Sequence, residues 1–421
     1  ELLRALAREA TAKLRDFSPQ GLANLVWAYG TLGLDEPALF RAVAGEAVAK
    51  LKDFSSQGLA GLAWAYGRRR EKELGLFDAA AGELKAMLGV VWATNFAGLL
   101  GEELLPPARS TLAQVGRALD AAGSPPELRA RVGLQGGGED QPQHPRVVQD
   151  AMDRLVIYKP PGWEVNQDGP DVHERQLSSY LQALLPARRW PIARDAAHSY
   201  GFLHRLDIPC SGIVLAATSY EAYYDLQAQL NVGRIAREYL VLCRGVLPPA
   251  RREVQARIHW TVGSRAPSSV RQRGKPSLTR LKVLAHALRQ GMALSLLLVR
   301  ITTGRRHQIR THTSHIGHPT VCDGKYTAPA TFASDRAWCA RNFIHRHRLA
   351  FEAARGEARE AVAPLPEDLA EVLLGLEPLS PGSAGTLAPQ PGGLGPGDWE
   401  ACVGLQAGGH RTARVLLEGV R

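Results

Sequence analysis

The sequence predicts a mixed α+β domain preceded by an α-helical repeat region. Short apolar runs in the central part are typical of strands, and they are mixed irregularly with helical periodicity rather than alternating with it. This pattern favours a mixed, largely antiparallel sheet with flanking helices over a regular parallel sheet. The expected strands are 155–158, 213–217, 239–243 and 294–301, and the expected helix is 220–230.

The N-terminal helices are predicted from a repeat with a period of 37 residues. Residues 17–18 recur at 54–55, and residues 27–30 recur at 64–67. Ser18 is a suitable N-cap, and Pro19 suits the first helical position. We therefore expect helical hairpins over residues 1–120, with their periodic aromatic residues in the core.

Two stretches rich in Gly and Pro suggest the domain boundaries. Residues 121–150 are expected to be a linker, and residues 378–421 a low-complexity linker and tail. The α+β domain is then expected to span 151–377. Because the chain begins with Glu1, inside a repeat, we expect a fragment whose targeting peptide is out of view.

The positive charge of the chain is concentrated in one segment. The formal net charge is +10, whereas residues 200–350 contain 23 Arg and Lys against 7 Asp and Glu, a balance of +16. Such an excess favours a polyanionic partner over a merely solvated basic face.

The cysteines and the hydropathy of the chain limit the cellular compartments in which we expect the protein. The five cysteines are scattered, odd in number and without a Cys-x-x-Cys pair, so neither a disulfide framework nor a thiolate zinc site is indicated. No apolar run approaches the ~18 residues that span a bilayer, so we expect no membrane partner. We expect an intracellular, reducing compartment.

Three polar clusters stand out as candidates for chemistry. His204-Arg205-Leu206-Asp207 places one carboxylate just before the strand expected at 213–217, where a loop can display a reactive group. Arg237-Glu238-Tyr239 follows, and 303–312 forms a third cluster rich in hydrogen-bond donors. The order and spacing of the three clusters are more specific than any one of them.

These segments resemble the RluA-type family of RNA pseudouridine synthases. The family signature has the form His-Arg-Leu-Asp-x-x-Thr-Ser-Gly, and this chain has Cys210 in place of the usual Thr. The resemblance covers about 153–351 and includes the turn Lys159-Pro160-Pro161-Gly162. It implies isomerisation of uridine to pseudouridine in rRNA or tRNA stem-loops, without cofactor or metal, and we expect a monomer.

The resemblance also implies roles for individual residues. Asp207 is the expected catalytic carboxylate, and it adds to the sugar or base or takes a sugar proton. Arg310 is the expected cation that keeps Asp207 ionised, through a bidentate contact. The remaining expected substrate-binding residues begin with Arg205, which fills the space left by the flipped base. Tyr239 is expected to pack on the uracil, with Ile309 as an apolar wall beside it. Arg237 is expected to meet phosphate and His204 to support the loop, and Lys159 completes the set.

Other interpretations stay open on the residues alone. Tyr239 can be a core residue of a strand, and Lys159 only a turn lysine. A catalytically inactive RNA-binding protein is the main alternative function. A glycoside hydrolase needs a second carboxylate, for which Glu238 and Asp323 are nearest in sequence. The histidines in and just after the third cluster lack metal-ligand spacing, and they are His307, His312, His315 and His318.

A second, weaker resemblance concerns residues 1–105. Their repeats are similar to octotricopeptide and FAST-kinase-like arrays of organellar RNA proteins. This resemblance implies RNA binding by the repeats and makes the mitochondrion and the chloroplast the candidate compartments.

Overall fold

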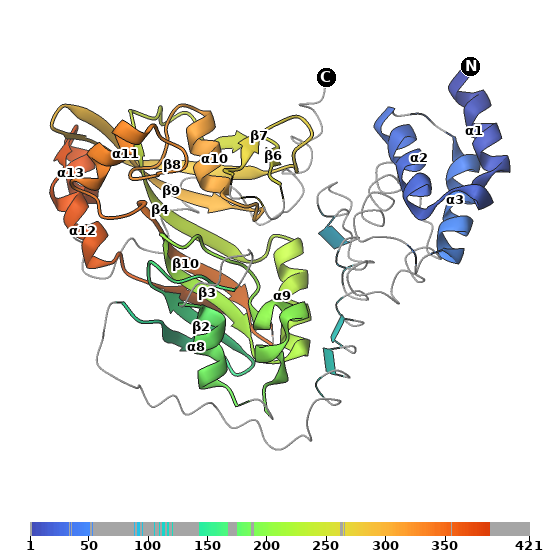
Figure 1. The fold of residues 1–421 in the computed structure, drawn as a ribbon, viewed down its shortest axis with the longest axis horizontal. Helices are drawn as coiled ribbons and strands as arrows, with labels where there is room; N and C mark the ends of the chain where they lie inside the picture. The colour runs from blue at the N-terminus through green and yellow to red at the C-terminus, as the bar shows by residue number, and fades with distance from the viewer. Residues whose placement is uncertain are drawn as a thin grey trace. The chain divides into compact units, whose positions relative to one another are not determined.

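The computed structural model describes two parts of the chain (Figure 1). In the N-terminal part it describes residues 2–32, 34, 36–50 and scattered positions from 53 to 120. In the second part it describes 143–387, with gaps at 167–174, 187–188, 262–263, 265 and 355. The two compact units are considered separately.

The N-terminal unit begins with three α-helices and one short 3-10 turn. These are α1 (Leu2–Ala12), η1 (Leu14–Asp16), α2 (Pro19–Leu32) and α3 (Pro37–Ala49). The backbone N–H of Gly21 donates to Ser18 Oγ, which makes Ser18 the expected cap of α2. Leu22, Val26 and Phe40 are fully buried between the helices. The repeat copy at 54–67 lies outside the described residues, so the repeat array stays a prediction.

The second unit is an α+β domain built on a ten-stranded, largely antiparallel sheet. The strands run in the order β1-β2-β3-β10-β4-β9-β8-β12, β11 pairs with β10, and β5 pairs with β8. Only the β3–β10 pair is parallel among the strand pairs of the described residues. The strand bounds are β1 Arg146–Asp150, β2 Arg154–Lys159, β3 Ser211–Ala217, β4 Ala236–Arg244, β5 Glu253–Gln255, β8 Leu278–Arg289, β9 Met292–Ile301, β10 Ile344–Glu352, β11 Ala358–Val362 and β12 Glu377–Pro378.

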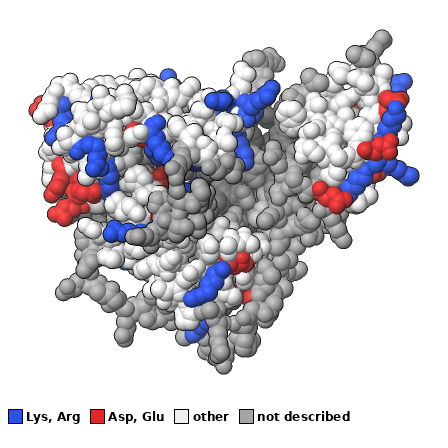
Figure 2. Space-filling view, in the orientation of Figure 1, with Lys and Arg blue, Asp and Glu red and all other residues white. Residues whose placement is uncertain are grey.

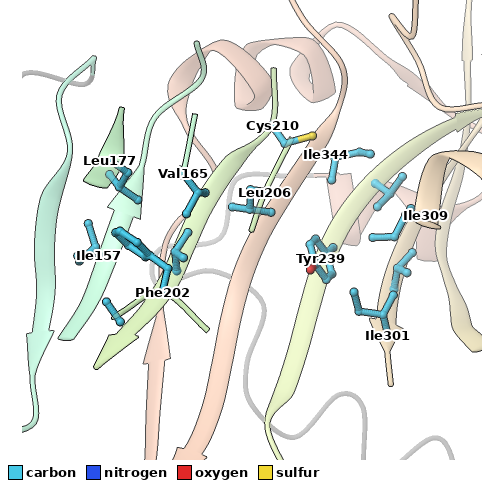
Figure 3. Packing of buried hydrophobic residues seen from close by; sticks show 14 of the residues in the cluster. Ile157, Val165, Leu177, Phe202, Leu206, Cys210, Tyr239, Ile301, Ile309 and Ile344 are labelled. Carbon is cyan, nitrogen blue, oxygen red and sulfur yellow. The ribbon is translucent and has the colours of Figure 1, made fainter. Parts of the chain in front are cut away.

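Helices cover both faces of this sheet. One face carries the cluster shown in Figure 3, in which Tyr239 of β4 packs with Ile301, Ile309 and Leu206. The opposite face carries Leu242 and Leu296, which pack against α12 and α13. The helical segments are α8 Leu177–Leu184, η3 Pro191–Arg194, η4 Ala196–Gly201, α9 Tyr220–Asn231, α10 Gln308–His315, α11 Pro329–Arg336, α12 Glu367–Leu374 and α13 Pro381–Leu387.

A separate two-stranded ribbon lies beside α10 (Figure 1). It consists of β6 (Ile258–His259) and β7 (Ser269–Val270). Ser268 Oγ donates to the carbonyl of Arg306, and the Tyr326 hydroxyl donates to the carbonyl of Ser268. The ribbon is thereby attached to the segment that precedes α10.

All five elements expected in the central part are present, but the domain boundaries differ from expectation. β1 falls inside the stretch expected to be a linker, because it pairs with β2. At the other end, α13 falls inside the expected tail, because Leu387 and Ser383 are buried against the sheet. In the described residues, no helix has the length and apolarity needed to cross a membrane.

Candidate active site

Arg346 of β10 anchors the loop that carries Asp207. Its guanidinium donates to the carbonyls of Arg205 and Ile213, so it ties together both ends of the loop. Arg346 is only 1% exposed. The loop runs into β3 at Gly212, whose φ is 129°. A Cβ at Gly212 would lie 2.3 Å from the carbonyl oxygen of Arg346, so only glycine permits this close approach of β3 to β10.

Lys159 anchors the other side of the same loop. Its fully buried ammonium group donates to the carbonyls of Pro160, Trp163 and Ile208. The backbone N–H of Gly162 also donates to the carbonyl of Ile208, at 2.8 Å. Burial lowers the pKa of Lys159 to about 7, against the opposing effect of Cys210 and Asp207. These contacts favour the turn-lysine interpretation and make Lys159 a support of the Asp207 loop.

Arg310 of α10 reaches Asp207, although a hundred residues separate them in the chain. Arg310 Nη1 donates to Asp207 Oδ2 at 2.8 Å. The bidentate contact expected with Asp207 is wrong, because Arg310 instead forms its two-pronged contact with Asp323, from Nε at 2.7 Å and Nη2 at 2.6 Å. In the described residues, Oδ1 of Asp207 accepts no hydrogen bond.

The charges of this group keep Asp207 ionised. Burial raises the pKa of Asp207, but the charge and hydrogen bond of Arg310, with the charges of His307 and Arg205, together outweigh burial, so the net pKa lies below the ordinary 3.8. Burial likewise raises the pKa of Asp323, but the hydrogen bonds and charge of Arg310, with the hydrogen bonds from Lys325 and Thr320, together lower it below the ordinary 3.8. Between two carboxylates, Arg310 has a pKa raised above its usual value despite burial. The Asp207 side chain remains 21% exposed, whereas that of Asp323 is fully buried.

The guanidinium of Arg346 forms a second network, with Tyr239 and His204. Arg346 donates to the Tyr239 hydroxyl and lies over its ring, 4.9 Å from the centroid. It also donates to His204 Nδ1 at 2.6 Å. Burial, followed by the charge of Arg346, lowers the pKa of His204 well below its usual value, so this histidine is neutral. His204 is therefore joined to Arg346, the residue that anchors the loop.

The other predicted site residues divide into accessible and buried groups. Arg205 is exposed next to Asp207. Tyr239 and Ile309 are 3% and 6% exposed and belong to the same apolar cluster. The phosphate contact expected of Arg237 does not fit the structure, because Arg237 is 3% exposed. Its guanidinium lies at the end of β9, away from the surface, and donates to the carbonyls of Ile301 and Thr302.

Two histidines of the third cluster, His307 and His312, have structural partners. His312 contacts Thr279 Oγ1 and the carbonyl of Ala256, and His307 contacts the Tyr326 hydroxyl. Within the described ranges, no group of three or more potential ligands is placed to hold a metal ion. Cys210 is 2% exposed, and burial raises its pKa to about 12, so its thiol stays protonated.

Sequence reasoning missed the roles of Arg346 and Asp323. Arg346 lies in the run His345-Arg346-His347-Arg348, where polar residues face both sides of the sheet, so periodicity gave no sign of a buried strand. Asp323 was considered only as a second carboxylate. The scarcity of acids offered a signal, because no Asp or Glu occurs between Glu253 and Asp323.

Comparisons with known proteins identify the family of this chain. The sequence model of the family described as RNA pseudouridylate synthase matches residues 153–315. Ribosomal large subunit pseudouridine synthase D of Yersinia pestis is 32% identical over 242 residues, covering 55% of this chain and 70% of the relative. An uncharacterized RNA pseudouridine synthase of Mycobacterium bovis is 32% identical over 191 residues, covering 45% of this chain and 60% of that protein.

A solved structure, human RNA pseudouridylate synthase domain containing 1, has a TM-score of 0.42 and 27% identity, with 57% of this chain and 91% of that chain covered. The family model and the named relatives define an isomerase that acts on RNA. The chain belongs to the RNA pseudouridine synthase family.

Proposed function

We propose that Asp207 is the carboxylate with which this protein isomerises a uridine of a structured RNA, such as an rRNA or tRNA stem-loop. The reaction breaks the bond from ribose C1′ to N1 and joins C1′ to C5. The C5 proton is lost and N1 gains one, so the isomer has the composition of the substrate. Whether the carboxylate adds to the sugar or base or removes a sugar proton, it must be ionised and have an accessible oxygen.

The observation that carries this proposal is the state of Asp207. Arg310 bonds one carboxylate oxygen and holds the pKa down, while the side chain stays 21% exposed. The other acids of the site region lack this combination. Asp323 is fully buried, and Glu238 is 2% exposed and occupied by Arg300 and Arg348. A second accessible carboxylate, which glycoside hydrolysis requires, is therefore not found beside Asp207 in the described residues.

Uracil recognition is proposed to use the surroundings of Asp207. The exposed Arg205 is suited to occupy the space that the uridine leaves when it rotates out of the stack. Tyr239 and Ile309 lie in one apolar cluster, which supplies a flat wall for the base (Figure 3). Only a small part of the Tyr239 ring is exposed, so we propose an edge contact or a slight movement of the ring on binding.

The charge distribution supports RNA as the substrate class. The stretch without acidic residues between Glu253 and Asp323 includes the β6–β7 ribbon. Figure 2 shows Lys and Arg gathered over this part of the surface. The exposed basic residues at the ribbon are Arg257, Arg271, Arg273 and Lys275. Tyr326 joins the ribbon to the site, because its hydroxyl bonds Ser268 and its ring lies 5.1 Å from the Arg310 guanidinium.

Product analysis tests the proposed function. The full chain is incubated with rRNA and tRNA transcripts, and the digested nucleosides and any free base are separated by liquid chromatography and identified by mass spectrometry. The proposal predicts pseudouridine, no free uracil, and loss of pseudouridine in the Asp207→Ala variant with RNA affinity retained. Free uracil would indicate hydrolysis. RNA binding without pseudouridine on any transcript would indicate the inactive RNA-binding alternative.

A further inference from the structure

Arg310 is shared between two carboxylates in an unequal way. Asp323 takes Nε and Nη2, which are the parallel donors of the guanidinium fork. Of the other N–H groups of the guanidinium, one on Nη1 bonds Asp207, at a single oxygen, Oδ2. The direction in which Arg310 presents Nη1 to Asp207 is thus set by the carboxylate behind it.

Asp323 is itself held rigidly. Thr320 Oγ1 donates to its Oδ2 at 3.0 Å, and the backbone N–H of Lys325 donates to its Oδ1 at 3.0 Å. The preceding residue is tied as well, because the backbone N–H of Cys322 donates to Asp335 Oδ2. Asp335 is in turn paired with Arg244 of β4. These contacts fix the orientation of the Asp323 carboxylate. The turn that carries Asp323 is attached to β4 through Asp335 and Arg244.

We propose that Asp323 is a positioning residue that orients Arg310 and keeps one oxygen of Asp207 open to the substrate. A guanidinium fork matches a carboxylate in a two-pronged geometry. Without Asp323 to occupy the fork, Arg310 is free to turn its two parallel donors onto Asp207 and bond both oxygens. The inference rests on the proposed function of Asp207, and it assigns to Asp323 an effect on chemistry rather than on RNA binding.

The chain contains a matched control for this arrangement. Arg348 donates from Nε and Nη2 to Glu360 and from Nη1 to Glu238, with the same use of its three nitrogens. Glu238 alternates with Tyr239 along β4, so this second triad lies on the sheet face opposite the site. Removing the fork partner here disrupts an equivalent ion pair without touching Asp207 or Arg310.

The test compares Asp323→Asn with Glu360→Gln in the full chain. An asparagine keeps the size but offers one acceptor in place of two, so it cannot hold the fork. We expect Asp323→Asn to lower the single-turnover rate of pseudouridine formation by roughly 10- to 100-fold, a change of about 1.4–2.7 kcal/mol in the barrier. The dissociation constant for the RNA is expected to stay within about twofold. Glu360→Gln is expected to retain the rate of the wild type.

A milder variant decides the matter if Asp323→Asn fails to fold or loses RNA binding. Thr320→Val removes one hydrogen bond to Asp323 and is expected to slow the chemical step by roughly threefold or more, with RNA binding retained. A wild-type rate in Asp323→Asn would overturn the inference, and so would equal losses of rate in Asp323→Asn and Glu360→Gln. If Thr320→Val has to replace Asp323→Asn, a wild-type rate in Thr320→Val would overturn it. Activity of the wild type and inactivity of Asp207→Ala, measured alongside, separate this failure from failure of the proposed function.

Discussion

The ammonium group of Lys159 donates to the carbonyl of Ile208, the residue that directly follows Asp207. Lys159→Met would leave the buried carbonyls of Pro160 and Trp163 without this donor, whereas the Ile208 carbonyl would keep the N–H of Gly162. We expect a loss of about 2 kcal/mol in the free energy of unfolding, because unsatisfied buried polar groups are costly. Urea denaturation of the variant and the wild type checks this expectation.

The pH dependence of stability should also report on Lys159. Its pKa is lowered to about 7 in the folded state and is 10.5 ordinarily, so between these values the unfolded chain binds more protons. Stability of the wild type relative to Lys159→Met should therefore rise with pH, by about 2 kcal/mol from pH ~7 to pH ~9. A difference that stays constant over this range would show that Lys159 remains charged when folded.

Arg310→Met would leave two neighbouring carboxylates without their shared cation. We expect a loss of about 3 kcal/mol at neutral pH, since one partner of a buried ion pair is removed. The folded-state pKa values of Asp207 and Asp323 lie below 3.8, so the stabilisation is present above that pH and is lost as the pH falls through the folded values. The difference between variant and wild type should therefore shrink as the pH falls below about 4 in denaturation experiments.

Arg348→Met is the control for this prediction. It removes the cation between Glu238 and Glu360, so a comparable loss of stability is expected. Activity of the folded Arg348→Met protein should remain, whereas that of Arg310→Met should disappear. Full pseudouridine formation by Arg310→Met would show that the reaction does not need Arg310.

Tyr239 combines a ring in the apolar cluster with a hydroxyl that accepts from Arg346. Tyr239→Phe removes only the hydroxyl, so we expect about 1 kcal/mol less stability and nearly full activity. Tyr239→Ala also removes the ring and should raise the barrier by about 1–3 kcal/mol, the usual contribution of base stacking on an aromatic. Single-turnover rates distinguish the two variants, and equal losses would show that the hydroxyl, not the ring, is needed.

The β6–β7 ribbon should contribute affinity rather than chemistry. Charge reversal of Arg271, Arg273 and Lys275 is expected to weaken RNA binding and to reduce the slope of log K against log salt by about 1 for each phosphate that is no longer neutralised. Filter binding at several salt concentrations measures both. Arg359→Glu, an exposed change on β11, is the control and should leave the slope unchanged. An unaltered slope in the triple variant would exclude the ribbon from the interface.

How far the sequence predicted the fold depends on how clean the apolar pattern is. β3 is a continuous apolar run, buried along its whole length, and was predicted at nearly its observed bounds. β8 was missed because the register shift between Val283 and Ala285 interrupts its alternation. β10 was missed because His345, Arg346 and His347 are buried through hydrogen bonds and ion pairs, which a hydrophobicity pattern does not reveal.

The site shows the same limit. The contact of Arg310 with Asp207 was expected from the motifs and is present, whereas its two-pronged partner Asp323 was not foreseen. That partner lies on a turn whose position depends on Asp335 and Arg244. Such long-range packing is set by the folded chain and leaves no local signature in the sequence.

The most direct measurement is pseudouridine formation by Asp207→Asn, assayed beside the wild type on a transcript that the wild type modifies. Asparagine keeps the shape of the side chain and an oxygen facing Arg310, so folding and RNA affinity should be retained. The account predicts no pseudouridine above the enzyme-free control. A folded Asp207→Asn protein that converts uridine at the wild-type rate would contradict it.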